Sequence, residues 1–367
     1  MVWALPCLLY TGMNNHERYI RRCFDLAITG AGSVSPNPMV GAVIVHENRI
    51  IGEGFHRQYG QAHAEVNAIQ NVSPANRYLL PQSTLYVSLE PCCIFGRTPP
   101  CTDLILRSGI PKVVISCLDQ TPGVAGQGVQ LLRERGVEVI TGVLEAQGQE
   151  LARFRNTFVT HQRPYIVLKF AQTLNGYIGQ PDQAVPISNK LTQRWVHKWR
   201  SEVDAILIGT QTALVDDPQL TNRLYFGKSP LRIVLDRTLR LPPTLRLFDQ
   251  SQPTLVVTQN AKSPAFADLV DQPPYPIQYL SLDFDEIWLP KLLHYLYEQK
   301  ISTLLVEGGA QLLHFFIETG LWDEALVLVG NRLLRQGVPA PHLAGMLCGR
   351  YRVGDDLLFR YQNVENR

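Results

Sequence analysis

The sequence predicts an α/β protein that contains two different domains, and three observations carry this prediction. Short apolar runs of strand length alternate with amphipathic helical segments along most of the 367 residues, a pattern typical of sheets layered with helices. A polar stretch over residues 145–163, helical in pattern but without clear core periodicity, marks a junction. No internal repeat relates the two sides of this junction, and a chain of this length is expected to form more than one core.

The first series of elements starts with a helix from Glu17 to about Thr29, where apolar residues recur at helical spacing. Apolar runs bounded by turn-forming residues predict strands. Two prolines open a further helix near residue 101, and Gly109 closes it. The other expected elements are strands over 39–45, 49–54, 84–89, 112–116 and 137–141 and helices over 63–70 and 126–135.

A second series begins at Pro164. Residues 304–316 read as a strand, a Gly-Gly turn and a helix, and such a turn lets a backbone approach a phosphate group. The domains are predicted at 14–150 and 160–367, with residues 1–13 as a non-native or disordered extension. The other expected elements are strands over 165–171, 203–209, 231–236, 253–258, 301–307 and 324–329 and helices over 189–201 and 285–299.

Charge and cysteine content restrict the function. The net charge is +2 and no long run of like charges occurs, so the sequence lacks the footprint of a nucleic-acid or membrane-surface protein. The near-neutral charge does not exclude small phosphorylated molecules as substrates. The seven cysteines are odd in number and irregularly spaced, which disfavours a disulfide framework and favours a reducing cytoplasm. Clustered cysteines are then candidates for metal binding or catalysis.

Three features of the first half converge on a metal site. His63 opens a helix, Cys92 ends a strand, and Cys101 starts the helix behind the two prolines. Catalytic zinc sites use three protein ligands and keep the fourth position for water, and one histidine with two thiolates meets that need. Glu65, two residues after His63, could move protons beside the metal.

The same residues match a known signature, H-x-E followed by P-C and a second cysteine, which is typical of zinc deaminases. Eight residues separate Cys92 from Cys101 here, rather than the usual two. A structural zinc normally takes four protein ligands, and Cys93 is the nearby extra candidate. Adjacent residues of an extended strand point to opposite sides, so an open, catalytic site is the favoured interpretation.

Together these motifs resemble the bifunctional deaminase/reductase family of riboflavin biosynthesis. The resemblance covers about residues 14 to 340, and the GRTPP insertion between the cysteines is its most specific mark. The motifs that carry it in the first half are PNPMVGAVIV, GEGFHRQYGQAHAE and LEPCCIFGRTPPC.

The resemblance implies a cytidine-deaminase-like three-layer N-terminal domain and a dihydrofolate-reductase-like C-terminal domain. The first would remove the 2-amino group of 2,5-diamino-6-(5-phosphoribosylamino)pyrimidin-4(3H)-one with Zn²⁺. The second would reduce the ribosyl group to ribityl with NADPH. It also implies a homo-oligomer, either a dimer or a tetramer.

Site residues follow from the resemblance position by position. His63, Cys92 and Cys101 match the zinc ligands and Glu65 the proton shuttle. Substrate positions of the deaminase are matched by Asn37, His56 and Arg97. In the second half, substrate positions are matched by Arg200, Leu220, Arg223 and Glu307, and NADPH positions by Ala171, Thr212, Asp216, Gly308, Gly309 and Ala310. Lys169 could assist protonation or bind polar groups of the substrate, and the sequence does not decide between these roles.

The chain departs from the family pattern at a few places. Ile94 stands where the family has a histidine, Asn175 where it has an aspartate, and Ala184 and Pro186 where it has serine and tryptophan. One alternative is therefore a deaminase with a degenerate reductase half. A scaffold protein with a structural zinc is a second alternative, and a nucleic-acid deaminase, disfavoured by the near-neutral charge, is a third.

Overall fold

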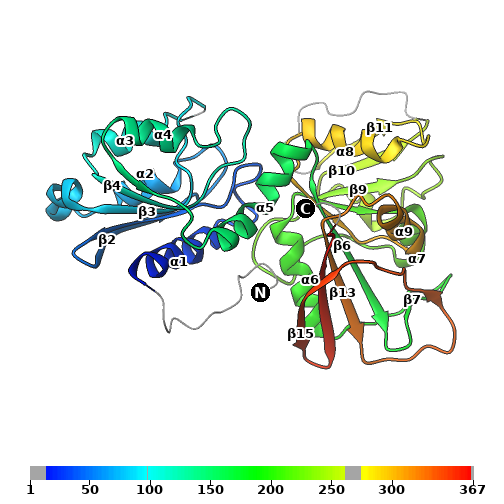
Figure 1. Ribbon diagram of the computed structural model, residues 1–367. Coiled ribbons are helices and arrows are strands. Elements are labelled where there is room, and N and C mark those ends of the chain that lie inside the picture. The colour runs from blue at the N-terminus through cyan, green and yellow to red at the C-terminus, as the bar shows by residue number, and fades with distance from the viewer. Residues whose placement is uncertain (1–13, 97, 261–273, 365–367) are drawn as a thin grey trace. The chain divides into compact units, whose positions relative to one another are not determined.

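The protein is described by a computed structural model that covers residues 14–96, 98–260 and 274–364. The chain divides into two compact units, one ending at Arg163 and the other beginning at Pro164 (Figure 1). The segment 1–13, expected to be an extension, lies outside the described residues. Along the described parts of the chain, no helix combines the length and apolar character needed to span a membrane.

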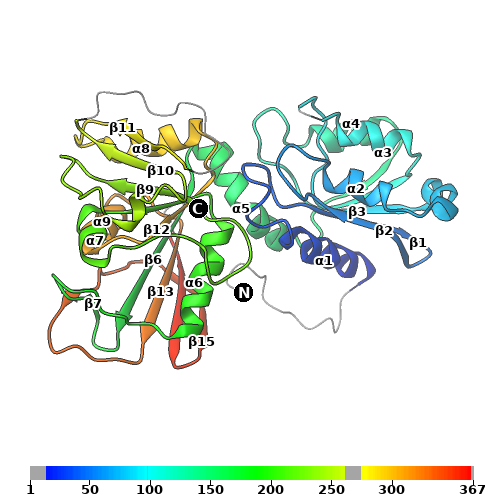
Figure 2. The ribbon, with the colours of Figure 1, turned by 180° about the vertical axis from the view of Figure 1, so that it is seen from behind.

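The first unit is a five-stranded mixed sheet between two layers of helices (Figure 2). The strand order is β2-β1-β3-β4-β5, with β1 antiparallel to both of its neighbours and β3, β4 and β5 parallel. Its strands are β1 (Gly41–His46), β2 (Arg49–Phe55), β3 (Thr84–Leu89), β4 (Lys112–Cys117) and β5 (Glu138–Ile140).

Alternating residues of β1 bury both faces of this sheet. Val43 and Val45 pack against helix α1 (Asn15–Ile28) and helix α5 (Glu145–His161), whereas Ala42 and Ile44 pack on the opposite side. The second layer contains α2 (Ala64–Gln70), α3 (Cys101–Arg107) and α4 (Gln127–Glu134). The expected three-layer architecture is therefore confirmed.

Helix α1 begins and packs for identifiable local reasons. The Asn14 side chain accepts the N–H of Glu17 at 3.0 Å, and the Glu17 carboxylate accepts the N–H of Asn14 at 2.9 Å, which forms a capping box. A Cβ atom at Gly41 would lie 2.0 Å from the carbonyl oxygen of Cys23. The absence of a side chain at Gly41 thus lets α1 rest directly on β1.

The second unit contains a nine-stranded sheet of order β11-β10-β9-β8-β12-β6-β13-β16-β15. The strands from β11 to β13 are parallel, and β16 and β15 add an antiparallel hairpin. The parallel strands are β6 (Tyr165–Thr173), β8 (Ala205–Ile208), β9 (Leu231–Leu235), β10 (Thr254–Thr258), β11 (Ile277–Ser281), β12 (Thr303–Val306) and β13 (Glu324–Gly330).

Both faces of the parallel part are buried. Ile166 and Leu168 of β6 belong to a core cluster that includes residues of α8 (Trp288–Glu298) and α9 (Ala310–Glu318). The intervening Val167 is also fully buried and points to the opposite face. The remaining helices are α6 (Lys190–Glu202) and α7 (Thr210–Asp216).

Several elements of the second unit are absent from the sequence prediction. They are α7, β11, the hairpin of β15 (Met346–Val353) and β16 (Asp356–Gln362), and the small pair of β7 (Tyr177–Gly179) and β14 (Val338–Pro339). Most residues of β15 are exposed, so the strand lacks the apolar alternation on which the prediction depends.

Candidate active sites

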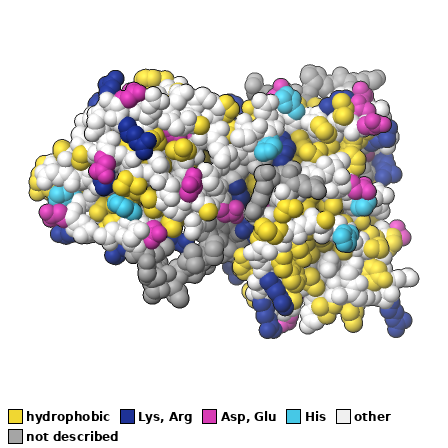
Figure 3. Space-filling view, viewed as in Figure 1, with side chains coloured by type: hydrophobic (Ala, Val, Ile, Leu, Met, Phe, Trp, Pro, Cys, Tyr) yellow, Lys and Arg dark blue, Asp and Glu magenta, His cyan; other side chains and the backbone are white. Residues whose placement is uncertain are grey.

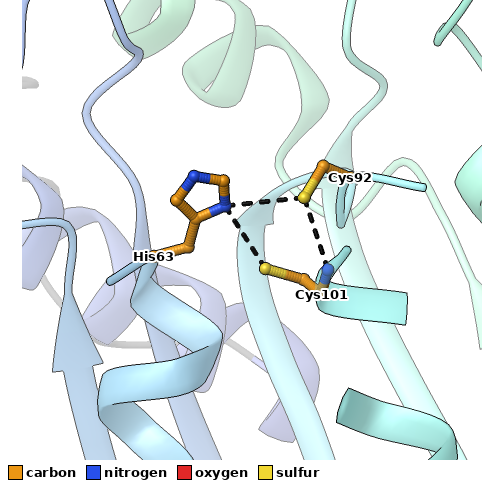
Figure 4. Close-up of side chains that lie close together, drawn as sticks. All are labelled: His63, Cys92 and Cys101. Carbon is orange, nitrogen blue, oxygen red and sulfur yellow. Dashed lines mark hydrogen bonds between the residues drawn. The ribbon is translucent and has the colours of Figure 1, made fainter. Parts of the chain in front are cut away.

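The three predicted metal ligands lie side by side in the first unit. His63 is the N-cap residue of α2, yet its side chain makes no capping hydrogen bond. Its Nδ1 atom instead lies 3.5 Å from Sγ of Cys92, after β3, and 3.3 Å from Sγ of Cys101, the first residue of α3 (Figure 4). Elements far apart in sequence therefore bring one imidazole and two thiols together.

The spacing of these donor atoms fits a zinc ion. All three lie within 4.8 Å of one another. Tetrahedral zinc with Zn–N of about 2.0 Å and Zn–S of about 2.3 Å requires N-to-S separations of about 3.5 Å, close to those observed. Among the residues that the structure describes, this is the group found to be able to hold a metal, and Cys93 does not belong to it.

The two thiols shift each other's pKa in opposite directions. Hydrogen bonding from Cys101 lowers the pKa of Cys92 to about 4, and the backbone N–H of Cys101 adds a bond of 3.4 Å to the Cys92 sulfur. Hydrogen bonding to Cys92, followed by burial, raises the pKa of Cys101. A divalent cation between the sulfurs would stabilise both thiolates. Cysteine must be deprotonated to bind a metal, so this arrangement suits metal binding.

A cavity of about 270 Å³ opens beside this cluster and contains most of the predicted deaminase residues. Glu65, only 3% exposed, contributes to its wall, and burial raises the pKa of this carboxyl to about 7. The predicted residues that line the cavity are Asn37, His56, His63, Glu65 and Cys92. The carboxyl group therefore lies where it can exchange protons with a molecule in the cavity.

A chain of hydrogen bonds orients the two predicted substrate contacts. The Nδ1 atom of His56 lies 3.0 Å from the carbonyl oxygen of Ala62, which can only accept, so Nδ1 carries the proton in the neutral ring. The Nε2 atom of His56 then accepts from the Asn37 amide nitrogen at 3.1 Å. This bond places the amide nitrogen of Asn37 against His56 and leaves its oxygen available as an acceptor.

The sequence prediction missed two charged residues of the cavity wall. The buried Glu90 carboxylate accepts the N–H groups of Asp119, Gly126 and Val129 at 2.9 to 3.2 Å, and so holds the loop before α4. Glu90 stands directly before the Pro91-Cys92 pair, and that position was the available signal.

Arg155 is the second missed residue. From α5 its guanidinium donates to the carbonyl oxygen of Pro36 at 3.4 Å and to the Thr121 hydroxyl at 3.2 Å. It thereby links the loop that carries Asn37 to the loop that Glu90 holds. Nothing in the polar pattern of residues 145–163 marks this arginine.

The sequence analysis also singled out Ile94 and Arg97 near this cavity. Ile94 lines the cavity and is 51% exposed, so an apolar side chain occupies the position that the family pattern gives to histidine. Arg97 lies outside the described residues.

In the second unit, Glu307 lies between two cations. Arg200 from α6 forms a two-pronged contact with the Glu307 carboxylate at 3.1 and 2.9 Å, and Lys169 from β6 lies 3.5 Å away. Burial alone would raise the pKa of Glu307, but the two cations outweigh it and lower the pKa to about 2. Three of the predicted reductase residues thus form one partly buried ionic cluster.

A short segment next to this cluster carries the other two predicted substrate residues. Arg200 also donates to the carbonyl oxygen of Thr221 at 3.3 Å, which connects the cluster to residues 220–223. Leu220 is 2% exposed and has a left-handed backbone, with φ of 55°. The side chain of Arg223 is exposed, as a group that meets an incoming ligand would be.

The predicted cofactor residues are partly brought together. Gly309 is the N-cap residue of α9, and a Cβ atom placed on it would lie 3.1 Å from the Thr212 hydroxyl of α7. The turn of Gly308, Gly309 and Ala310 therefore lies beside α7. Among the described residues, no hydrogen bond joins Ala171 of β6, or Asp216 at the end of α7, to this turn.

Asn175, which stands where the family pattern has an aspartate, has a clear local role. Its amide nitrogen donates to the carbonyl oxygen of Leu334 at 2.6 Å, and its Oδ1 atom accepts from the Thr173 hydroxyl at 2.8 Å. An aspartate could not make the first of these bonds. Ala184 and Pro186 are exposed, and no side-chain contact explains these two departures.

Comparison with known proteins decides the family. Residues 164–346 match the RibD C-terminal domain, and residues 13–117 match the cytidine and deoxycytidylate deaminase zinc-binding region. The riboflavin biosynthesis protein RibD of Aquifex aeolicus (strain VF5) is 37% identical over 353 residues, which cover 95% of each chain. The chain belongs to the RibD family.

Other RibD proteins agree with this assignment. RibD of Escherichia coli (strain K12) is 32% identical over 369 residues, or 95% of this chain and 96% of its own. The crystal structure of a diaminohydroxyphosphoribosylaminopyrimidine deaminase/5-amino-6-(5-phosphoribosylamino)uracil reductase from Thermotoga maritima is 34% identical, with a TM-score of 0.84 over 95% of this chain and 99% of its own. A structure of Acinetobacter baumannii RibD is 31% identical and has the same TM-score, covering 95% and 98%.

Membership in the RibD family settles the class of protein. It is a bifunctional riboflavin-biosynthesis enzyme with a zinc-dependent deaminase domain and a reductase domain. Because the match to RibD extends across both halves, the comparisons support both activities and not the alternative of a degenerate reductase. The matched zinc-binding region includes His63, Cys92 and Cys101.

Proposed function

We propose that the first domain hydrolyses the 2-amino group of 2,5-diamino-6-(5-phosphoribosylamino)pyrimidin-4(3H)-one. The second domain then reduces the product, 5-amino-6-(5-phosphoribosylamino)uracil, to its ribityl form with NADPH. The observation that carries the proposal is the His63, Cys92 and Cys101 cluster beside a cavity that also contains Glu65. The two activities for which the similar Thermotoga maritima protein is named support this choice of substrates.

In the deaminase cavity, His63, Cys92 and Cys101 would hold the zinc ion. When bound, zinc supplies Lewis-acid activation of a water molecule. Glu65 takes a proton at its carboxylate and returns it to the leaving amino group, so that water is consumed and ammonia released. Asn37 binds a polar edge of the pyrimidine through its free amide oxygen, and His56, whose two ring nitrogens already have partners, contacts the pyrimidine with its ring. The assignment of Arg97 to the substrate phosphate stays a prediction.

In the reductase site, the charges of the ionic cluster would orient the sugar. Arg223 binds the substrate phosphate as a guanidinium, and Glu307 accepts hydrogen bonds from sugar hydroxyls while Arg200 fixes its carboxylate. Leu220 contacts the substrate from the same segment. Lys169 binds a polar group of the ribosyl chain or assists its protonation.

The cofactor would bind at the neighbouring turn. The turn of Gly308, Gly309 and Ala310 offers backbone N–H groups to NADPH phosphates, because it begins helix α9. Ala171, Thr212 and Asp216 contact other parts of the cofactor in this proposal. The nicotinamide supplies the hydride to the sugar C1 atom, and the protein mainly positions the two partners.

The setting of the enzyme is also proposed. The substrate is a small phosphorylated pyrimidine and not a nucleic acid, and on the face drawn in Figure 3 basic side chains are interspersed with acidic and neutral ones. A cytoplasmic homo-oligomer, dimer or tetramer, fits the cysteine content and the resemblance to the family. The domain limits of 14–150 and 160–367 stay a prediction.

Incubation with the diamino-pyrimidinone substrate tests the proposal, with ammonia release and NADPH oxidation followed separately. Ammonia release should occur without NADPH, and NADPH oxidation should require prior deamination. NADPH oxidation without ammonia release would contradict the proposed order. The absence of both ammonia release and NADPH oxidation from zinc-loaded protein would favour the scaffold alternative.

A further inference from the structure

His197 lies at the reductase site, although the sequence prediction gives it no role. It belongs to α6, one helical turn before Arg200, and is 4% exposed. Residues three apart share a face of a helix, so His197 and Arg200 face the same side of α6. A buried polar ring in this position requires an explanation beyond packing.

The ring contacts the segment that carries the predicted substrate residues. The Nδ1 atom of His197 accepts the backbone N–H of Arg223 at 3.1 Å. A backbone N–H can only donate, so the proton of the neutral ring is on Nε2. Burial, together with the cations Arg200 and Arg223, lowers the pKa of His197 to about 4, and the ring is therefore an uncharged acceptor at neutral pH.

The segment 220–223 is attached to its surroundings by its backbone. Arg200 holds the carbonyl oxygen of Thr221, and the Ser229 hydroxyl accepts the N–H of Asn222 at 3.0 Å. Leu220 adopts its left-handed conformation just before these bonds, and such a conformation persists in a non-glycine residue only when neighbouring contacts enforce it. The hydrogen bond from the Arg223 N–H to His197 fixes the end of the segment, at Arg223 itself.

We propose that His197 is a positioning residue of the reductase site, whose neutral imidazole fixes the backbone of Arg223. The Arg223 side chain is thereby presented to the phosphorylated pyrimidine in one orientation. His197 acts through the segment and does not touch the substrate. This inference rests on the proposed function, in which Arg223 binds the substrate phosphate.

Two substitutions at the same position test the role of the acceptor. His197→Leu removes the acceptor of the Arg223 N–H, whereas His197→Asn keeps an acceptor oxygen at the δ position. We expect His197→Leu to raise KM for 5-amino-6-(5-phosphoribosylamino)uracil about tenfold. KM for NADPH and the rate of ammonia release should stay within about twofold, and His197→Asn should restore KM to within about threefold of the unaltered enzyme.

A matched control is His294→Leu, the same substitution at a 58% exposed position of α8, which should leave all these constants unchanged. If His197→Leu does not fold, His197→Phe replaces it, because it also lacks an acceptor. An unchanged substrate KM in the Leu variant, or an equal increase in the Leu and Asn variants, would overturn the inference.

Arg223→Gln separates this inference from the proposed function. If Arg223→Gln raises the substrate KM and His197→Leu does not, the positioning role alone is wrong. If Arg223→Gln leaves the substrate KM unchanged, the assignment of Arg223 to the substrate is wrong, and the inference about His197 is overturned with it.

Discussion

Replacing Glu307 by glutamine should destabilise the second unit at neutral pH and much less in acid. The carboxylate lies between Arg200 and Lys169, whose side chains are only 11% and 14% exposed, so removing its charge leaves two buried cations without their counter-ion. Breaking a buried ion pair from one side is strongly destabilising, because the remaining charge stays desolvated.

The size of the effect follows from the pKa of Glu307, which falls from 4.5 to about 2 in the folded protein. At about 1.4 kcal/mol for each pH unit, this corresponds to about 3 kcal/mol of folding free energy at pH 7. Since the folded pKa is lowered, this contribution is complete above pH 4.5 and is lost as the pH falls toward 2. At pH 3 about 1 kcal/mol should remain.

Urea unfolding followed by tryptophan fluorescence measures this difference. Four of the five tryptophans, at 195, 199, 288 and 322, belong to the second unit, so the signal reports mainly on that unit. Glu318→Gln, at a 62% exposed position of α9, serves as the control and should change stability by less than about 0.5 kcal/mol. A Glu307→Gln effect that is equal to the control, or that is as large at pH 3 as at pH 7, would refute the reasoning.

Three further predictions address the first unit. Cys101→Ser should reduce bound zinc from about one ion per chain to a small fraction, as measured by elemental analysis, and full zinc occupancy would contradict the ligand set. Asn37→Asp removes the donor to His56 and should raise KM for the deaminase substrate about tenfold without changing NADPH oxidation of pre-deaminated substrate; equal effects on both activities would count against a local role. Gly41→Ala places a methyl group against the Cys23 carbonyl and should cost about 1–3 kcal/mol in urea unfolding, and a neutral result would show that α1 can shift away.

The metal site was predictable because each ligand carries its own local signal. His63 at a helix start and Cys101 behind two prolines are positions whose secondary structure is readable from the chain, and Cys92 follows a strand with a clear apolar pattern. Their convergence then required only that the sheet and helices form one layered unit. The fold of that unit was predictable for the same reason.

The contacts of the residues that support the sites were not predictable, because their partners come from distant parts of the chain. Glu90 holds N–H groups about 30 to 40 residues away, and His197 holds the backbone of Arg223. Arg155 donates to the carbonyl oxygen of Pro36, 119 residues away along the chain. None of these contacts follows from periodicity or spacing, and the exposed strand β15 shows the same limit for secondary structure.

The division of work between the two domains can be tested most directly with Glu65→Gln. This change keeps the size of the side chain and the three metal ligands but removes the carboxylate that moves the proton. The account predicts that zinc content is unchanged, that ammonia release falls at least 100-fold, and that NADPH oxidation of pre-deaminated substrate stays within about twofold. Ammonia release at the unaltered rate, or parallel loss of both activities in a folded, zinc-loaded variant, would contradict it.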